Sequence, residues 1–483
     1  MIYRAQGEDR LWDTWLLEDG GNVHLFYLIY QKDLSCVSIG HATSDDLIHW
    51  DELPPIDLLD AGGNIGTGCA LIRNHTMYLF YTVGMPDGQQ IFLSTSSDGN
   101  IFTPYNDNPV MRIESPYSGN DFRDPAIYLN AESQQYEAYL CSYLSGRDIG
   151  ACIARYLSKD LIHWNAAPPL AVVDERFTLA ETPSYFRIAD RHYISFYSSD
   201  RYTPNIITPH RIRPCGTFYM IADTQNGEYR FTENPLLLGS GNGRMEAIVG
   251  RVTDFRGDKI LVHHYAGDQP ALGLPKQVKA NTDGSLYLSL WNGADRMNGM
   301  ETDFPDLTDH SRTVGGTWER MDSGWKGKAG LLYSAALSED QWDDFDLSCT
   351  VTCRGERASV LFRTDKVTEG LHLTLDFERN VCEFGALFQC HTGGFRLSSL
   401  DVYHAAGLIR GREVHIRILM REEYFEMYMD DRWIFSCVCK SHVWPENSFT
   451  QNAPHTGAIG LAVEGGEALF SDLKLKKLTK IGR

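Results

Sequence analysis

The first part of the chain repeats one arrangement of apolar and polar positions. Each unit begins with an aromatic or aliphatic strand, continues with a second strand and a polar turn, and ends with another apolar strand. The units recur at intervals of about 50–70 residues, a spacing typical of repeat architectures. The aromatic strands are His24–Tyr30, Met77–Val83, Tyr136–Tyr143, His192–Ser199 and Lys259–Tyr265.

The turn falls at the same place in every unit. Its sequence is TSDD, SSDG, LSKD, TQNG or NTDG, and Asp-Gly and Asn-Gly tolerate the positive φ that tight hairpins need. The phrase Asp-Leu-Ile-His-Trp occurs at both Asp46–Trp50 and Asp160–Trp164. We interpret it as structural, with the Asp capping a turn and the Trp packing between blades. Five such units predict a β-propeller of four-stranded blades, with unrelated hairpins in a large sandwich as the alternative.

The pattern changes near Gly315. Short stretches with period-two alternation follow, such as Leu371–Phe377 and Val414–Met420, and they indicate half-buried antiparallel strands. We therefore predict an all-β fold: a five-bladed β-propeller in residues 1–300, followed by a C-terminal β-sandwich in residues 315–483. Met297–Gly316 is the expected connection between the two domains.

An acidic residue precedes four of the five aromatic strands by about 10–13 positions, a hairpin's length of chain. These residues are Asp13, Asp124, Glu181 and Glu246, and the remaining unit has Thr67. The innermost strand of each blade lines the central channel, so we expect these side chains to meet at the mouth of the channel.

Crowded, buried carboxyl groups acquire different pKa values and can divide into an acid and a base. Arg123 is positioned to keep Asp124 ionised, and paired carboxylates beside aromatic rings are the equipment for breaking a glycosidic bond. The candidate aromatic wall consists of Trp12, Trp15, Phe26, Trp50 and Tyr185, although packing in the core is the plainer role for each of them. Calcium binding is a weaker alternative, because the chain has no short Asp-x-Asp-x-Asp run, and we expect no metal.

The bulk composition narrows the partners. The formal net charge of −20 argues against binding to nucleic acid or anionic membranes. No apolar stretch approaches the roughly 18 residues of a spanning helix, and no secretory leader is visible. The 11 Cys residues are scattered, which favours a reducing, cytoplasmic location.

Several motifs together resemble glycoside hydrolase family 32 and its clan partner, family 68. Arg123-Asp124-Pro125 is similar to the Arg-Asp-Pro motif of these families, and Glu181-Thr182-Pro183 resembles the Glu-Cys-Pro motif of family 32. Gly40–Trp50 and Leu272–Val278 are similar to two further family 32 segments. The likeness extends from about Trp12 to Trp291, and the sandwich fits the two-domain layout of the family.

The resemblance implies a five-bladed propeller that acts on fructosyl linkages with retention of configuration and without a cofactor. It implies that Asp13 is the nucleophile, Glu181 the general acid/base and Asp124 the stabiliser of the transition state. Retention would place the carboxyl groups of Asp13 and Glu181 about 5–5.5 Å apart. Trp12, Trp15, Phe26, Trp50, Thr67, Arg123 and Glu246 are the expected substrate-binding residues.

Two departures from the family pattern leave the substrate open. Trp12-Asp13-Thr14-Trp15 is closer to the Trp-Asp-Ser-Trp of family 68 levansucrases, and Leu28 replaces a usual Gln. The sequence therefore predicts a carbohydrate-binding β-fructofuranosidase-like enzyme acting on sucrose, a fructo-oligosaccharide or a fructan. An inverting arabinofuranosidase of the family 43 type and an inactive glycan-binding protein remain alternatives. Glu246 could also replace Glu181 as the acid, and association of copies through the sandwich is open.

Overall fold

We describe the fold from a computed structural model of the chain. It describes residues 2–6, 10–30, 35–58, 61–146, 150–173, 177–199, 215–240, 247–265, 270–308, 313–366, 369–389, 395–405, 407–438 and 455–479. The chain divides into two compact units, Met1–Arg296 and Met297–Gly482, which we describe separately. Within the described ranges, no helix is both long and apolar enough to cross a membrane.

Four separate four-stranded antiparallel sheets make up most of the described part of the first unit. In each of them the strands pair in chain order, so that every sheet is a simple meander. The sheets are β1 (Arg10–Asp19), β2 (Asn22–Tyr30), β3 (Ser38–Ser44) and β4 (Asp51–Asp57); β5 (Asn64–Arg73), β6 (Thr76–Met85), β7 (Gly88–Ser96) and β8 (Thr103–Pro104); β9 (Tyr117–Asn130), β10 (Gln135–Leu144), β11 (Ala151–Ser158) and β12 (Asn165–Val172); and β13 (Glu181–Ile188), β14 (Arg191–Ser198), β15 (Cys215–Ala222) and β16 (Arg230–Ser240).

A further set of strands follows in the same unit. It consists of β17 (Ala247–Phe255), β18 (Asp258–Tyr265), β19 (Ala271–Leu272), β20 (Lys276–Ala280) and β21 (Leu286–Leu290), and a 3₁₀ turn, η3 (Asn292–Arg296), comes next. β17, β18, β20 and β21 pair in that order, but they are not among the separate four-stranded sheets. The sequence predicted five separate blades, whereas the described residues form four separate four-stranded sheets.

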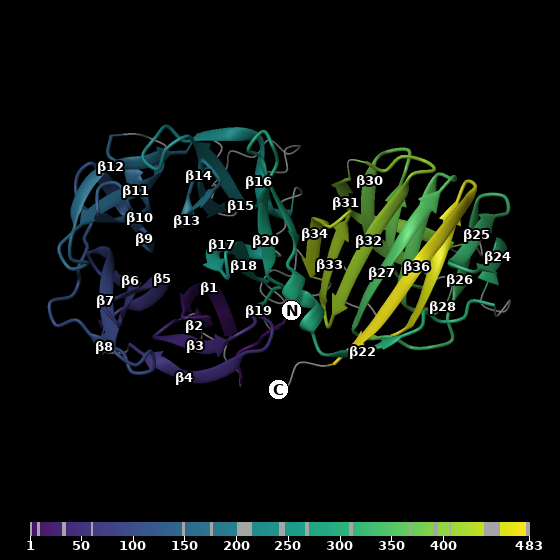
Figure 1. Ribbon diagram of the computed structural model, residues 1–483, viewed down its shortest axis with the longest axis horizontal. Coiled ribbons are helices and arrows are strands. Elements are labelled where there is room, and N and C mark those ends of the chain that lie inside the picture. The colour runs from purple at the N-terminus through teal and green to yellow at the C-terminus, as the bar shows by residue number, and fades with distance from the viewer. Residues whose placement is uncertain are drawn as a thin grey trace. The chain divides into compact units, whose positions relative to one another are not determined.

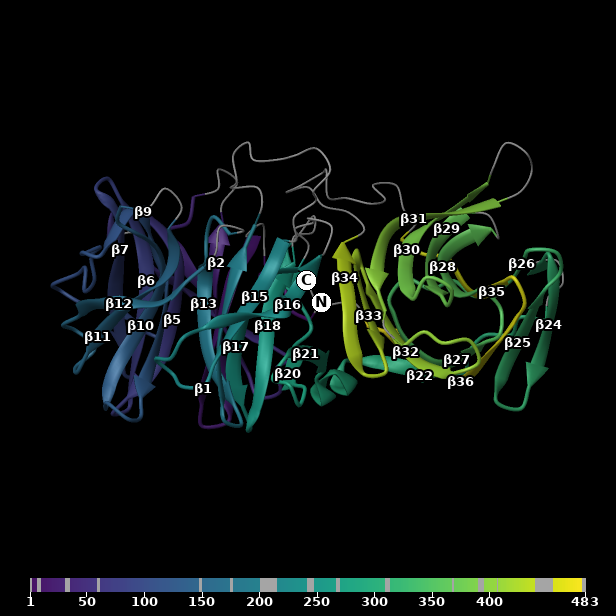
Figure 2. The ribbon, with the colours of Figure 1, turned by 90° about the horizontal axis from the view of Figure 1, so that it is seen from above.

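The first strands of these sheets surround a common centre. β1 contacts β5, β5 contacts β9, β9 contacts β13, β13 contacts β17, and β17 contacts β1, which closes the ring. Figure 1 shows the sheets radiating from these strands, and Figure 2 shows the strands running from one face of the ring to the other. The all-β class and the propeller arrangement are confirmed, and the predicted aromatic strands lie in β2, β6, β10, β14 and β18.

The repeated Asp-Leu-Ile-His-Trp phrase forms the same turn twice. Asp46 Oδ1 accepts hydrogen bonds from the backbone N–H groups of Ile48 and His49, and Oδ2 lies 2.9 Å from His49 Nδ1. Asp160 makes the equivalent bonds in the second copy. The ring of Trp164 lies edge-on to Phe80 of the preceding sheet, with 6.1 Å between centroids. The structural interpretation of the phrase is confirmed.

The described strands of the second unit form two sheets. One has the order β34-β33-β32-β27-β36-β25-β24, with β22 beside β36, and the other has the order β23-β26-β35-β28-β29-β30-β31. The strands are β22 (Gly299–Thr302), β23 (Thr313–Val314), β24 (Gly316–Met321), β25 (Gly324–Ala329), β26 (Tyr333–Leu337), β27 (Phe345–Cys353), β28 (Arg357–Lys366), β29 (Glu369–Asp376), β30 (Val381–Gln389), β31 (Phe395–His404), β32 (Glu413–Arg421), β33 (Tyr424–Met429), β34 (Arg432–Val438), β35 (Ala458–Glu464) and β36 (Glu467–Leu478).

One apolar core is common to both sheets of this unit. Phe362 of β28 stacks on Phe425 of β33, with ring centroids 5.4 Å apart and an interplanar angle of 3°. The predicted connection, Met297–Gly316, is more than a linker, because it contributes β22 and β23 to these sheets.

The two copies of the turn differ in burial, and this difference sets their expected contribution to stability. The side chain of Asp46 is 9% exposed and that of Asp160 is 48% exposed. We expect Asp46→Ala to destabilise the fold by about 1–3 kcal/mol, because the buried N–H of Ile48 and the part-buried N–H of His49 lose their acceptor, and Asp160→Ala to cost less than about 1 kcal/mol. Thermal unfolding of both variants, with the exposed Asp45→Ala as control, measures the difference. Equal losses at Asp46 and Asp160 would contradict the argument.

Candidate active site

Each inner strand of the ring carries a β-bulge at the same level. The register with the neighbouring strand shifts between Trp12 and Thr14, between Gly66 and Gly68, between Arg123 and Ala126, between Glu181 and Ser184, and between Ile248 and Arg251. A bulge adds an unpaired residue and redirects its side chain, and bulges are common beside active sites. The five bulges therefore direct side chains into the channel at one level, where a regular strand would not direct them.

Four of these bulges contain a residue with positive φ. Asp13 has φ of 24°, Asp124 of 59°, Thr182 of 46° and Val249 of 54°. Non-glycine residues adopt this region at a cost of about 1–3 kcal/mol, and such strain collects at functional sites. The bulges also show how the units correspond: Asp13, Thr67, Asp124 and Thr182 occupy equivalent places, whereas Glu181 lies one residue earlier.

Asp13 is held by a neighbouring strand. Thr67 Oγ1, which is buried on β5, donates a hydrogen bond of 2.5 Å to Asp13 Oδ2. Asp13 itself is partly exposed. The bond fixes one carboxylate oxygen and leaves the other available for a ligand in the channel.

Asp124 is the most enclosed of the three acids, with 3% of its surface exposed. Its Oδ2 accepts a hydrogen bond of 3.0 Å from the backbone N–H of Thr182. Its own N–H donates to Thr82 Oγ1, which in turn donates to the carbonyl of Thr67. A chain of hydrogen bonds thus joins the bulges of β5, β9 and β13.

Glu181 is paired with a cation on the neighbouring strand. Arg123 Nη2 donates a hydrogen bond of 2.8 Å to Glu181 Oε1, and Arg123 Nε lies 3.6 Å from Asp124 Oδ2. Asp121 contacts the same guanidinium. Arg123 therefore links Asp124 and Glu181 through charge-assisted contacts.

The three carboxyl groups lie close enough to influence one another's charge. Burial, followed by the neighbouring charge of Asp124, raises the pKa of Asp13 to about 7, against the opposing hydrogen bond from Thr67. Burial also raises the pKa of Asp124 and of Glu181, and Arg123 opposes the rise at both. Near neutral pH such a cluster holds fewer than three negative charges, so one group can donate a proton while another attacks.

Two residues of the predicted aromatic wall, Trp15 and Phe26, lie in the core. Phe26 is fully buried and Trp15 is 2% exposed, and their rings stack at 6.0 Å inside the core. A side chain without exposed surface cannot contact a sugar ring. Trp50 borders β4, the strand of its sheet farthest from the inner strand β1, and Tyr185 bonds His192 at 2.7 Å. Trp12 is partly exposed beside Asp13, and its ring lies 4.6 Å from that of His264.

Of the other predicted substrate-binding residues, two lie at the site and one lies outside the described residues. Thr67 and Arg123 contact the predicted acids directly. Glu246 lies outside the described residues. Among the described residues, no group of three or more His, Cys, Asp and Glu side chains is arranged to hold a metal ion.

The sequence did not indicate three contributors to the site. Thr82 closes the chain of hydrogen bonds between bulges, and Gln89 accepts the backbone N–H of Phe122 at 3.0 Å. Arg251 enters the channel from β17, where its charge opposes the raised pKa values of Asp13 and Asp124. Arg251 lies on β17, the inner strand of its unit, and is basic where the other inner strands carry acids or Thr67.

Comparison with known proteins gives a family match for part of the chain. A family model described as the glycosyl hydrolases family 32 N-terminal domain matches residues 16–244. The matched segment is therefore similar to the N-terminal domain of glycoside hydrolase family 32. Asp124 and Glu181 lie inside the matched region, and Asp13 lies just before it.

Curated relatives match this chain over parts of their length. Levanase of Bacillus subtilis is 30% identical over 161 residues, which are 30% of this chain and 22% of that protein. The β-fructofuranosidase, insoluble isoenzyme CWINV1, of Arabidopsis thaliana is 26% identical over 209 residues, 40% of this chain and 35% of that protein. The chain thus matches about a fifth and a third of the length of these two relatives.

Solved structures of family 32 members match over nearly the whole chain. The β-fructofuranosidase of Bombyx mori superimposes with a TM-score of 0.67 at 16% identity, covering 99% of this chain and 94% of that one. Sucrose-6-phosphate hydrolase of Lactobacillus gasseri gives a TM-score of 0.69 at 14% identity, covering 97% and 91%. At these identities the likeness establishes the fold.

The raised pKa of Asp13 has a consequence for stability. As the pH rises from about 4 towards 7, an unfolded Asp loses its proton before the folded one, so the folded state loses stability over this window and does not recover it above. Asp13→Asn removes the charge and can keep the bond from Thr67. We expect this variant to melt at a higher temperature than the parent chain at pH 8 and at the same temperature below pH 4. Calorimetry checks this, with the exposed Asp19→Asn as control, and a variant less stable than the parent at pH 8 would contradict it.

Proposed function

We propose that this chain is a β-fructofuranosidase-type glycoside hydrolase that cleaves terminal fructofuranosyl linkages with retention of configuration. The observation that carries the proposal is the meeting of three acids from three inner strands at one level of the channel. Thr67 holds Asp13, and Arg123 joins Asp124 to Glu181. The names of the family 32 relatives above, levanase and β-fructofuranosidase, support a fructosyl substrate.

The roles of the acids follow from their partners. In the first step Asp13 forms a bond to the anomeric carbon while the glycosidic bond breaks, and Glu181 gives its proton to the departing oxygen. In the second step Glu181 takes a proton from water, which displaces Asp13 and releases fructose with its original configuration. Asp124, enclosed and hydrogen-bonded by the backbone of Thr182, accepts hydrogen bonds from sugar hydroxyls.

Glu181 must hold its proton when substrate arrives. Its burial and the neighbouring charge of Asp124 favour the protonated form, whereas the bond from Arg123 opposes it. Substrate that engages Arg123 would loosen this bond and strengthen Glu181 as an acid. Trp12, partly exposed beside Asp13, is the aromatic surface that we assign to the sugar, and Glu246 remains a proposed binding residue.

We also propose a fifth blade and the boundaries of the two domains. We assign β17, β18, β20 and β21 as the fifth blade, because β17 closes the ring of inner strands and carries the fifth bulge. We assign residues 1–300 as the catalytic propeller and residues 315–483 as a β-sandwich, since the two sheets of the second unit share one core.

The substrate class is tested by incubating the chain with sucrose, inulin, levan, raffinose and aryl arabinofuranosides. We expect release of fructose from at least one fructosyl substrate, with proton NMR showing retention in the first product formed. An inverted product would replace this mechanism with that of an arabinofuranosidase of the family 43 type. Binding without hydrolysis, unchanged in Asp13→Asn, would indicate an inactive glycan-binding protein.

The identity of the acid is tested by the leaving group. We expect Glu181→Gln to slow cleavage of a natural linkage by about 10²–10⁴-fold, because the departing oxygen lacks its proton. An aryl fructofuranoside with a good leaving group needs less help in the first step, so the initial burst of released aryl alcohol should fall much less. Glu246→Gln is the matched comparison and should affect both substrates equally. If only Glu246→Gln showed the rescue, the acid would be Glu246.

A further inference from the structure

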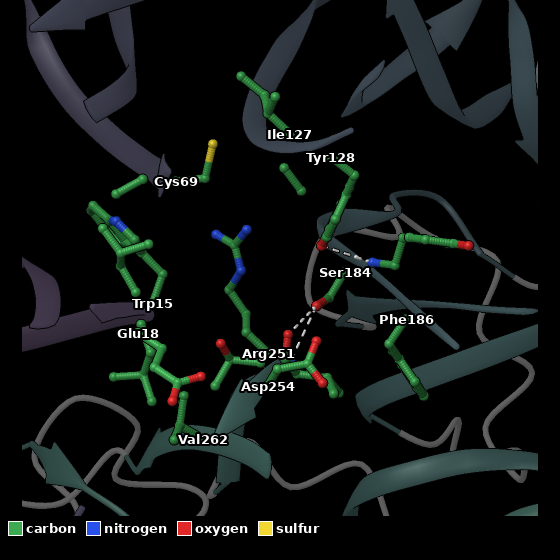
Figure 3. A pocket seen from close by; sticks show the side chains of 17 residues that line it. Trp15, Glu18, Cys69, Ile127, Tyr128, Ser184, Phe186, Arg251, Asp254 and Val262 are labelled. Atoms are coloured by element: carbon green, nitrogen blue, oxygen red, sulfur yellow. Dashed lines mark hydrogen bonds between the residues drawn. The ribbon is translucent and has the colours of Figure 1, made fainter. Parts of the chain in front are cut away.

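A buried arginine reaches into the channel from the fifth inner strand. Arg251 comes directly after the bulge of β17, and 6% of its surface is exposed. Figure 3 shows its guanidinium in the middle of a pocket, with Cys69 on one side and Tyr128 on the other. Burying a permanent charge is costly unless partners compensate for it, so the contacts of this side chain indicate its purpose.

Two backbone carbonyls accept hydrogen bonds from Arg251. Nη1 donates to the carbonyl of Gly68 at 2.7 Å, and Nη2 donates to that of Pro125 at 3.4 Å. Gly68 directly follows the bulged Thr67, and Pro125 follows Asp124 inside the bulge of β9. A bulge disrupts the ladder and leaves backbone groups in need of other partners. One guanidinium therefore fastens the two bulges that present Thr67 and Asp124.

The charge of Arg251 also acts on the acids. It lowers the pKa of Asp13 and of Asp124, in opposition to the larger effect of burial. The titratable groups around it are Asp13 and Glu18 on β1, Cys69 on β5, Asp124 and Tyr128 on β9, Tyr185 on β13 and Asp254 on β17. Asp254 is 65% exposed and pairs with Lys259, so water screens its effect on Arg251.

The pocket beside Arg251 is too small for a second sugar site. Its volume is about 160 Å³, below the roughly 300–1,000 Å³ of ordinary ligand pockets. Its lining comes from residues of the inner strands that follow the bulges, such as Leu17, Ile127 and Val252. This space gives Arg251 room but does not assign it a ligand, which leaves the two bulges and the acids as its targets.

We propose that Arg251 is a positioning residue for the reaction: it fastens the bulges that carry Thr67 and Asp124 and sets a permanent positive charge beside the carboxyl groups of Asp13 and Asp124. The proposal rests on the proposed function in assigning Asp13 as the nucleophile. It adds a residue from the fifth inner strand to a site whose acids come from three others.

The test separates charge from attachment. Arg251→Gln removes the charge, so protonation of Asp13 becomes easier, and we expect the acidic limb of kcat/KM to move to higher pH. Arg251→Lys keeps the charge but cannot reproduce the fork of two bonds, so its acidic limb should stay near that of the parent while kcat falls. The control is Arg256→Gln. Arg256 is an exposed arginine at the end of the same strand, and it donates a hydrogen bond to the carbonyl of Asp45. This variant should change neither the acidic limb nor kcat.

The outcomes are decisive for the charge. An acidic limb in Arg251→Gln that coincides with the parent would overturn the proposal, and so would a limb in Arg251→Lys displaced as far as expected for Gln. Thermal unfolding establishes which variants are folded. If Arg251→Gln does not fold, the acidic limb of Arg251→Lys alone tests the proposal. A ¹³C NMR titration of Asp13, assigned with Asp13→Asn, follows the same shift without turnover. Absence of fructosyl hydrolysis in the parent would therefore refute the proposed function and still leave the role of Arg251 decided by the titration.

Discussion

Three carboxyl groups lie within reach of one another in the channel of this propeller, and their negative charges repel. Burial raises the pKa of Asp13, Asp124 and Glu181 alike. A fold that only buried these groups would protonate them all and remove the nucleophile. Each acid therefore has its own partner: a hydroxyl for Asp13, a backbone N–H for Asp124 and a guanidinium for Glu181.

The propeller supplies these partners because its inner strands lie side by side around one axis. Each acid takes its main partner from a neighbouring strand: Thr67 of β5 serves Asp13 of β1, and Arg123 of β9 serves Glu181 of β13. The bulges make this possible, since they direct the side chains of all five strands at one level. The strain at Asp13 and Asp124 is the local cost of that geometry, and the regular pairing of the outer strands sustains it.

The sequence predicted much of this arrangement because blades repeat. The turns of Asp46 and Asp160 and the acids upstream of the aromatic strands follow a period that can be counted. What cannot be counted is a bulge: Glu181 stands one residue before the position equivalent to Asp124, and Thr182 occupies that position. The sequence also does not show which aromatic residues are buried. Trp15 and Phe26 are residue types that can stack on a sugar, but both lie in the core. The role of Arg251 could not be predicted from the sequence, because its hydrogen-bond partners are backbone carbonyls, which every residue has.

The central claim is that Asp13 attacks the sugar while Glu181 serves the departing and entering oxygens. It is tested most directly by quenching Glu181→Gln during reaction with an aryl fructofuranoside and measuring the mass of the protein. Because this variant cannot activate water for the second step, the account predicts a gain of one hexosyl unit on the peptide that contains Asp13. A protein of unchanged mass while product accumulates, or a sugar attached to another carboxylate, would contradict it.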